Sequence, residues 1–462
     1  MSYSMQERQT PQLVKGTRDF NALQVAQRSY IFDTIRQVYQ KYGFSPLETP
    51  ALEYVSTLFG QYGQEGEQLV FRVLNSGNFL GDTPQALLID QNYKEVLPKI
   101  SEKGLRYDLT VPLMRYVATH YHELTLPFRR YQIQPVWRAD RPQKGRYREF
   151  YQCDADVVGT PSLIVEAEIL AMAYEVLQRL GINDFIIHLN HRSILNGIAS
   201  QIGELERVNE FCTIVDKLDK VGKDKVITEL LSKGFSEAGL EKFDFIFDLQ
   251  GDNNAKLDIL SNHLAHDKVG SKGLQELKEI LQYLEALGMT QVPISFEPSL
   301  ARGLAYYTGA VFEVKLPTIN IGSIAGGGRY DNLAEHFGVS SLTGVGFSFG
   351  VDRLYVAMEQ LNLFPQQAYF NTKVMVTNLD EESVKVALDI ITRLRNHDIP
   401  AELYPEKVKL KKQLMYANKK DIPFVLIIGE EERQASKFTL KDMSTGDQAF
   451  YTFDQLINIL SN

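Results

Sequence analysis

Residues 128–158 constrain what this chain can fold into more than any other segment. Two runs with many apolar and aromatic residues, 128–137 and 150–158, predict two strands. The loop between them is polar, and from 129 to 148 the segment holds seven basic residues against the single acid Asp140. We therefore expect a hairpin that presents a cluster of arginines at its tip or on its inner face.

Such a cluster suits phosphate groups. A guanidinium group offers a rigid fork of donors that matches phosphate oxygens, and it stays charged at any working pH. A solvated basic loop is the alternative, and most charge clusters are of that kind. The borders of the loop, Trp137-Arg138-x-Asp140 and Arg146-x-x-x-Phe150, favour a binding site. The basic residues of the segment are Arg129, Arg130, Arg138, Arg141, Lys144, Arg146 and Arg148.

Length, charge and cysteine usage exclude several classes of protein. A chain of 462 residues suggests about three domains. The net charge of -9 argues against indiscriminate polyanion binding, so any nucleic-acid contact should use local basic patches. Cys153 and Cys212 form no Cys-x-x-Cys pair, so the sequence supports neither a metal site nor a disulfide framework.

The first residues do not resemble an export signal. Residues 1–19 lack the basic, apolar and small-residue pattern of a signal peptide. No apolar run reaches the roughly 18 residues that span a bilayer. We therefore expect a cytoplasmic protein with no membrane contact.

The amino-acid composition and the hydrophobic periodicity change along the chain. An amphipathic helix is predicted at 28–41 and another at 162–180, within a first part that ends near 188. Residues 189–292 are rich in Lys, Glu, Asp and Leu, with helical periodicity and almost no proline. This stretch indicates a helical insertion between two parts of one catalytic domain, 1–188 and 293–366.

Short strands return after the insertion and again near the end of the chain. The expected strands of the second catalytic part are 294–298, 309–315 and 321–325, and a glycine-rich turn is expected at 326–328. Residues 371–462 alternate between strand and helix, which predicts a separate α/β domain with a mixed sheet. Its strands are expected at 373–377, 400–403, 424–428, 437–442 and 448–453, and its helices at 381–396 and 407–420.

The arginine-rich hairpin resembles motif 2 of the class II aminoacyl-tRNA synthetases, and its run 141–150, RPQKGRYREF, is close to the version in histidyl-tRNA synthetases. The resemblance implies an α+β catalytic domain with an antiparallel sheet, a helical insertion and a C-terminal anticodon-binding domain. It also implies that Arg138 holds the α-phosphate of ATP. Phe150 would then stack on adenine, and Arg146 would reach toward the γ-phosphate.

Three further segments are similar to family motifs. Residues 344–354, GVGFSFGVDRL, resemble motif 3, in which Arg353 would bind the γ-phosphate. Their glycines run G-x-G-x-x-x-G and so miss the dinucleotide-binding fingerprint. Residues 47–52 would be the motif 1 element that builds a dimer interface in the family, and 15–20, KGTRDF, match the N-terminal signature.

Two other segments resemble the histidine-specific part of the family. Residues 300–309, LARGLAYYTG, are similar to the segment usually written RGLDYY, and 323–331, SIAGGGRYD, to its glycine-rich companion. Ala305 stands where the family usually has Asp. Since the arginine and the two tyrosines of the segment are intact, we interpret this as a change in a neighbouring residue.

The resemblance assigns the histidine pocket residue by residue. Asp108, Thr110 and Gln152 would contact the α-amino group. Asp156 and Tyr307 would read the imidazole, because a carboxylate and a phenol suit a ring with two polar nitrogens. The histidine-binding set is Asp108, Thr110, Gln152, Asp156, Tyr306 and Tyr307, and the ATP-binding set is Arg138, Arg146, Phe150, Arg302 and Arg353.

The implied reaction is that of a histidine–tRNA ligase. The carboxylate of L-histidine attacks ATP, with Mg²⁺ as the accompanying ion, and the histidyl group then passes to the 3′ end of tRNA-His. Arg302 and Arg138 would be the catalytic residues, facing the α-phosphate from opposite sides. The family resemblance also implies a homodimer.

Three other interpretations remain open. The regulatory subunit of ATP phosphoribosyltransferase resembles the catalytic domain but lacks the C-terminal anticodon domain. Synthetases for proline, threonine or glycine lack the RGLxYY run. A nucleic-acid-binding accessory protein of the same fold would not need the complete set of phosphate-binding arginines.

Overall fold

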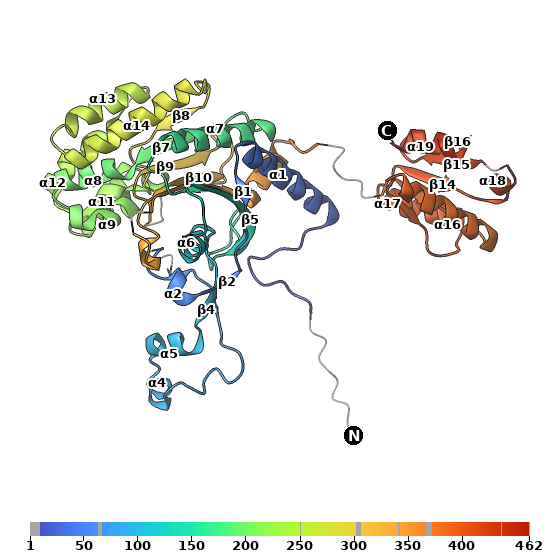
Figure 1. Cartoon of the computed structure of the whole chain (residues 1–462), viewed down its shortest axis with the longest axis horizontal. Coiled ribbons are helices and arrows are strands. Elements are labelled where there is room, and N and C mark those ends of the chain that lie inside the picture. The colour runs from blue at the N-terminus through green and yellow to red at the C-terminus, as the bar shows by residue number, and fades with distance from the viewer. Residues whose placement is uncertain are drawn as a thin grey trace. The chain divides into compact units, whose positions relative to one another are not determined.

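The computed structural model describes residues 10–62, 67–249, 251–301, 306–340, 342–365, 372–435 and 437–461. They form two compact units that divide between Phe364 and Pro365 (Figure 1). No described helix combines the length and the apolar character needed to cross a bilayer.

The first unit is built on an eight-stranded sheet with the order β1-β5-β6-β11-β10-β9-β7-β8. Its six central strands pair antiparallel, as expected, and a parallel pair lies at each edge. A second, three-stranded sheet has the order β2-β4-β3. The strands are β1 (Ser45–Pro46), β2 (Leu52–Tyr54), β3 (Arg72–Val73), β4 (Lys103–Leu105), β5 (Phe128–Trp137), β6 (Glu149–Val158), β7 (Ile186–His191), β8 (Ile294–Phe296), β9 (Ala310–Lys315), β10 (Ala325–Tyr330) and β11 (Gly344–Gly350).

Helices cover one face of the large sheet and extend from one of its ends (Figure 1). The predicted helices at 28–41 and 162–180 correspond to α1 and α7. The helices of the unit are α1 (Ala22–Lys41), α2 (Val55–Leu58), α4 (Gln85–Ile89), α5 (Tyr93–Ile100), α6 (Thr110–Thr119), α7 (Ile164–Arg179), α8 (Arg192–Gln201), α9 (Val208–Val215), α10 (Leu218–Val221), α11 (Lys223–Ser232), α12 (Glu237–Phe243), α13 (Asn253–His263), α14 (Lys268–Ala286) and α15 (Val351–Gln360).

The hairpin β5–β6 has one apolar and one polar face because side chains alternate along a strand. On β6, Cys153, Ala155 and Val157 are fully buried in the hydrophobic core. The residues between them, Asp154 and Asp156, are polar and point to the opposite face. One face of the hairpin can therefore pack against helices while the other carries polar groups.

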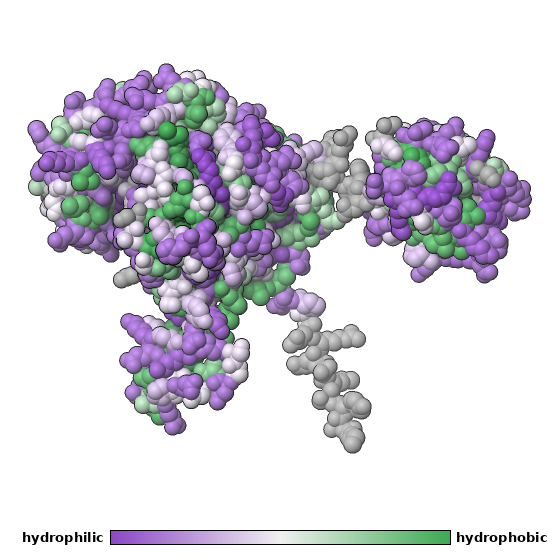
Figure 2. Space-filling view, viewed as in Figure 1, coloured by the Kyte–Doolittle hydropathy of each residue, from purple (hydrophilic) through white to green (hydrophobic). Residues whose placement is uncertain are grey.

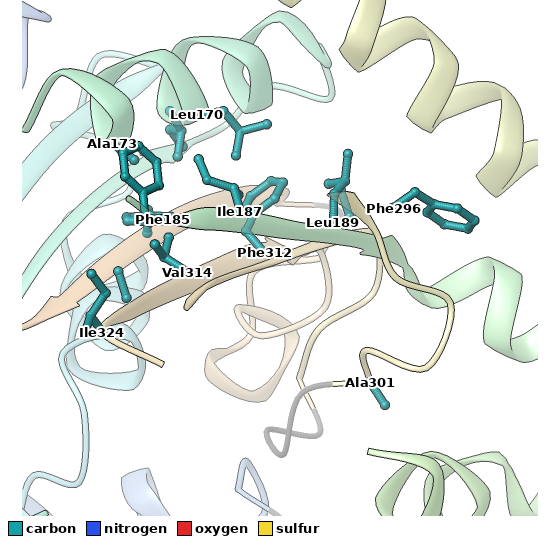
Figure 3. Packing of buried hydrophobic residues seen from close by; sticks show 14 of the residues in the cluster. Leu170, Ala173, Phe185, Ile187, Leu189, Phe296, Ala301, Phe312, Val314 and Ile324 are labelled. Carbon is teal, nitrogen blue, oxygen red and sulfur yellow. The ribbon is translucent and has the colours of Figure 1, made fainter. Parts of the chain in front are cut away.

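The core lies between the large sheet and the helices that cover it. Figure 3 shows Leu170 and Ala173 of α7 above Ile187 of β7, with Phe312 of β9 beside it. The same continuous core includes Phe211 of α9 and residues of α12, α13 and α14. The helical segment that follows β7 therefore shares the core of the sheet instead of forming one of its own.

A smaller segment extends from the three-stranded sheet. It carries α4 and α5, and neither helix has a buried residue. Leu80, Ile89 and Tyr93 are 42%, 71% and 65% exposed, and Figure 2 shows apolar surface among polar residues on this segment.

The prediction of a turn at 326–328 is wrong. These glycines lie inside β10, which is buried along its whole length and pairs with β9 and β11. A Cβ atom added to Gly327 would lie 2.0 Å from the backbone oxygen of Gly346. Glycine marks either a turn or a close backbone approach, and here it allows a close approach. The strand predicted at 321–325 accordingly begins only at Ala325.

The second unit has a five-stranded mixed sheet with the order β13-β12-β14-β15-β16, which confirms the expected α/β domain. The first three strands pair parallel and the last two antiparallel. Helices α18 and α19 were not predicted. The elements are β12 (Val374–Val376), α16 (Glu381–Asn396), β13 (Ala401–Leu403), α17 (Leu410–Lys419), β14 (Phe424–Ile427), α18 (Glu430–Ala435), β15 (Phe438–Asp442), β16 (Gln448–Tyr451) and α19 (Phe453–Ser461).

We predict that Gly327→Ala destabilises the protein by about 1–3 kcal/mol, the usual range for overpacking. Gly350→Ala is the matched control, because a Cβ there would meet only a carbonyl oxygen at 3.6 Å. Urea denaturation of both variants measures the difference. Equal unfolding midpoints would contradict the close-approach explanation.

Candidate active site

A cavity of about 1550 Å³ opens over the polar face of the large sheet. It gathers residues that are more than 200 positions apart in the sequence, from Tyr62, after α2, to Arg353 at the start of α15. Arg302, which the sequence also predicts for this site, lies outside the described residues. The other ten predicted residues all line the cavity: Asp108, Thr110, Arg138, Arg146, Phe150, Gln152, Asp156, Tyr306, Tyr307 and Arg353.

Asp156 lies on the floor of the cavity. The Arg130 guanidinium is 2.9 Å from its Oδ2 atom, and the Tyr330 hydroxyl donates to its Oδ1 atom at 2.5 Å. Burial raises the pKa of Asp156, and the neighbouring Arg130 opposes that rise. Asp156 pairs with Gly346 across the sheet, and a Cβ there would lie 1.9 Å from Oδ1. The carboxylate therefore fits because position 346 has no side chain.

Asp108 is a second buried carboxylate, just before α6. Its Oδ1 atom accepts hydrogen bonds from the Val111 backbone N–H at 3.1 Å and from the Tyr62 hydroxyl at 3.0 Å. Its Oδ2 atom accepts one from the Tyr306 hydroxyl at 3.2 Å. Burial raises its pKa, and these hydrogen bonds oppose the rise. Asp108 thus connects the start of α6 with the tyrosine pair, whose ring centroids are 4.8 Å apart.

Gln152 lines the cavity two positions before another carboxylate, Asp154, which our sequence analysis did not select. The Gln152 Nε2 group donates to the Ser348 hydroxyl at 2.9 Å, and its buried Oε1 atom has no partner in the described part of the chain. Burial raises the pKa of Asp154 to about 7. The signal that could have identified Asp154 is the alternation along β6, which places 152, 154 and 156 on one face.

Arg138 also lines the cavity and lies between two aromatic rings. Its Nε group donates to the Tyr107 carbonyl at 3.0 Å. The guanidinium carbon lies 4.1 Å from the Tyr107 ring centroid and 5.3 Å from that of Phe150. Stacking of this kind fixes the guanidinium plane while leaving its outer N–H groups available.

The tip of the arginine-rich loop is tied to α15. Arg146 makes two hydrogen bonds to the Asp140 carboxylate, at 2.8 and 3.0 Å. Gly145, with φ of +74°, forms the turn beside it. Arg353 of α15 donates to the carbonyl of Gly145 at 3.2 Å and to that of Ser323 at 2.5 Å. The cations of the loop and of α15 therefore face the same cavity.

The N-terminal signature packs behind this loop. Arg18 and Arg28 both pair with Asp352 at the start of α15, the latter at 2.6 Å. The Arg18 guanidinium carbon lies 3.3 Å from the centroid of the Tyr147 ring. The segment 15–20 thus supports the site from outside and does not line the cavity.

Two family models match the chain. The model described as histidyl-tRNA synthetase matches residues 89–354. The chain is 50% identical to a histidine–tRNA ligase of Cytophaga hutchinsonii over 97% of this chain and 99% of that protein. The chain belongs to the histidyl-tRNA synthetase family. A second model, described as anticodon binding domain, matches residues 373–462.

Other members of the histidyl-tRNA synthetase family match over nearly the full length. A histidine–tRNA ligase of Porphyromonas gingivalis is 49% identical, covering 96% of this chain and 98% of its own. The crystal structure of histidyl-tRNA synthetase from Nostoc sp. gives a TM-score of 0.79 at 30% identity, covering 98% of this chain and 99% of that chain. The class II synthetase fold inferred from the sequence motifs is confirmed.

We predict that Arg130→Met lowers the free energy of unfolding by about 3–5 kcal/mol at pH 7, because it leaves the Asp156 charge buried and unpaired. The loss should shrink as the pH falls through the raised pKa of Asp156, where the carboxyl takes up a proton. Chemical denaturation between pH 5 and 8 measures both effects.

Arg129→Met is the matched control on the same strand. Its partner Glu168 is 2.6 Å away, and both side chains are about 30% exposed. Such a surface pair contributes about 0–1 kcal/mol, so a loss equal to that of Arg130→Met would contradict the argument.

Proposed function

We propose that this chain is a histidine–tRNA ligase whose activation reaction takes place in the 1550 Å³ cavity. The observation that carries the proposal is the combination of opposite charges in the lining of this cavity. Two buried carboxylates, Asp108 and Asp156, are hydrogen-bonded by tyrosines, and the arginines of the loop and of α15 line the same cavity. An amino acid with a cationic amino group suits the carboxylates, and a triphosphate suits the arginines.

The residues around the two carboxylates divide between the two polar parts of histidine. Asp108, Thr110 and Gln152 contact the α-ammonium group, which can only donate hydrogen bonds. Asp156 and Tyr307 contact the imidazole nitrogens. Asp156 is oriented for this by Arg130 and Tyr330, and the Tyr306 hydroxyl orients Asp108. Buried polar groups that need a partner reject analogues that lack the matching nitrogen.

The arginines bind ATP as its Mg²⁺ complex. Arg138 contacts the α-phosphate, and Phe150 stacks on adenine. Arg353 and Arg146 contact the γ-phosphate, with Arg146 exchanging the Asp140 carboxylate for a phosphate. From its sequence motif, Arg302 contacts the α-phosphate opposite Arg138.

The chemistry needs alignment more than proton transfer. A carboxylate oxygen of histidine attacks the α-phosphorus, a new O–P bond forms, and the bond to the β-phosphate oxygen breaks to release pyrophosphate. The nucleophile is already ionised, so no general base is required. The arginines hold the reactants in line and neutralise the charge that develops on the phosphates. A terminal ribose hydroxyl of the tRNA then attacks the acyl carbon, and AMP leaves.

The match of residues 373–462 to an anticodon-binding model argues against the regulatory-subunit alternative, which lacks this domain. A structure from Bacillus halodurans, described as an ATP phosphoribosyltransferase regulatory subunit/histidyl-tRNA synthetase, has a similar fold with a TM-score of 0.69. At 20% identity it supports only the fold. The RGLxYY-like segment argues against the synthetases for proline, threonine and glycine.

We further propose that the protein acts as a homodimer through the motif 1 region. Strand β2 begins at Leu52, the last residue of the segment 47–52. Leu52 and Tyr54 are 47% and 59% exposed, which suits a protein interface. Sedimentation equilibrium of the preparation used in the assays below tests this, and a monomer at micromolar concentration would contradict it.

We predict that pyrophosphate exchange with Mg²⁺-ATP is supported by histidine and by no other standard amino acid. Arg138→Ala should lower the exchange rate by about 10²–10³-fold, on the order of 3 kcal/mol, because it removes one pre-organised phosphate contact. Arg141→Ala, an exposed position in the same loop, is the control and should retain the activity. Exchange with a different amino acid would overturn the specificity. If the folded protein catalyses no pyrophosphate exchange with any amino acid, the proposed activity is refuted.

We also predict a role for the lysines around α17 in tRNA binding. Lys409, Lys411 and Lys419 are exposed, so replacing all three by alanine should weaken tRNA-His charging and reduce its salt dependence. Histidine-dependent pyrophosphate exchange should stay unchanged. Lys385→Ala on α16 is a single-charge control. Loss of exchange in the triple variant, or unchanged charging, would contradict the assignment.

A further inference from the structure

The cavity-facing side of β6 carries Gln152, Asp154 and Asp156, and the proposed function uses only the first and the last. Asp154 is 2% exposed and lines the same cavity. Burying a carboxylate is costly unless its interactions compensate. The residues that surround Asp154 therefore indicate its role.

Asp154 is connected to Gln152 through a single hydroxyl group. Asp154 and Ser348 are Cα partners in the pairing of β6 with β11. The Ser348 side chain lowers the pKa of the facing Asp154 carboxyl, as a nearby hydroxyl donor does, and its oxygen accepts a hydrogen bond from the Gln152 Nε2 group at 2.9 Å.

The direction of these two hydrogen bonds follows from the chemistry of a carboxylate. An ionised carboxylate only accepts, so the Ser348 hydroxyl must donate to Asp154. Its oxygen then presents lone pairs to Gln152, which must donate its amide N–H group. The Gln152 Oε1 atom is thereby turned away from Ser348, and it is buried without a partner in the part of the chain that the structure describes.

We propose that Asp154 is a positioning residue for histidine, which acts through Ser348 to fix the amide of Gln152 so that Oε1 faces the α-ammonium group. The inference rests on the proposed function, in which Gln152 contacts that group. An ammonium group needs an acceptor, and a Gln152 amide turned the other way would present a second donor instead.

Asp154 titrates near neutral pH, which gives the arrangement a pH dependence. Burial raises its pKa to about 7, and Arg130 opposes the rise. A protonated Asp154 can donate to Ser348, and the direction of the hydrogen bonds is then no longer fixed. The charged and titratable groups around Asp154 are Arg130 on β5, Asp156 on β6, Asp108 before α6, Arg106 after β4 and, behind the sheet, Cys153 and Tyr39.

Isothermal titration calorimetry of the full chain tests the proposal with two ligands, histidine and imidazole-4-propionate, which lacks the amino group. At pH 8, Asp154→Asn and Ser348→Ala should each weaken histidine binding about ten-fold, as expected for one charge-assisted hydrogen bond. Neither should change the affinity for imidazole-4-propionate. The double variant should be no weaker than either single variant, because both changes break the same connection.

The pH dependence supplies a second readout. The ratio of the histidine dissociation constants of Asp154→Asn and the unchanged protein should fall from about ten at pH 8 toward one at pH 6. Titration of the histidine imidazole affects both proteins and cancels in this ratio. Thermal denaturation at pH 8 confirms that each variant is folded.

Two results would overturn the proposal. If the substitutions weaken the binding of histidine and of imidazole-4-propionate equally, Asp154 shapes the pocket in general. If the effects of the two substitutions on histidine affinity are additive, Asp154 acts without Ser348. Failure of the unchanged protein to bind histidine would instead refute the proposed function on which the inference rests.

Discussion

The buried ion pair between Arg130 and Asp156 is the interaction on which the site depends. It crosses the β5–β6 hairpin at the one register where two opposite charges face each other on the polar side of the sheet. A buried charge is costly unless a counterion or hydrogen bonds compensate for the loss of solvent. The pair therefore makes it possible for a carboxylate to lie on the floor of the cavity, where we propose that the imidazole ring binds.

Much of the fold could be inferred from the sequence because its signals are local. Both strands of the hairpin were located to within one residue at each end, since apolar residues and the polar loop between them mark the boundaries. The alternating C-terminal domain was inferred for the same reason. The order of strands in the large sheet could not be inferred in this way. Strands β7 and β9 are neighbours in the sheet although more than 100 residues separate them in the sequence. No local pattern encodes that pairing.

Within the site, the motifs predicted side chains that come together in one cavity, whereas a residue that is defined only by its neighbours was not predicted. Ten predicted side chains line one cavity, although the sequence holds them in separate segments. Asp154 was missed because its importance arises from Ser348, nearly 200 residues away. The glycines of β10 were misread as a turn because a sequence does not distinguish a bend from a backbone that must approach another strand closely.

Gly346 has a consequence for how this pocket can change in evolution. The floor under Asp156 is bare backbone, since any side chain at 346 would occupy the space of the carboxylate. Mutation at that position can therefore only fill the pocket and never deepen it. A family member that came to accept a bulkier amino acid would have to gain room from other lining residues, so a change in specificity cannot begin at position 346.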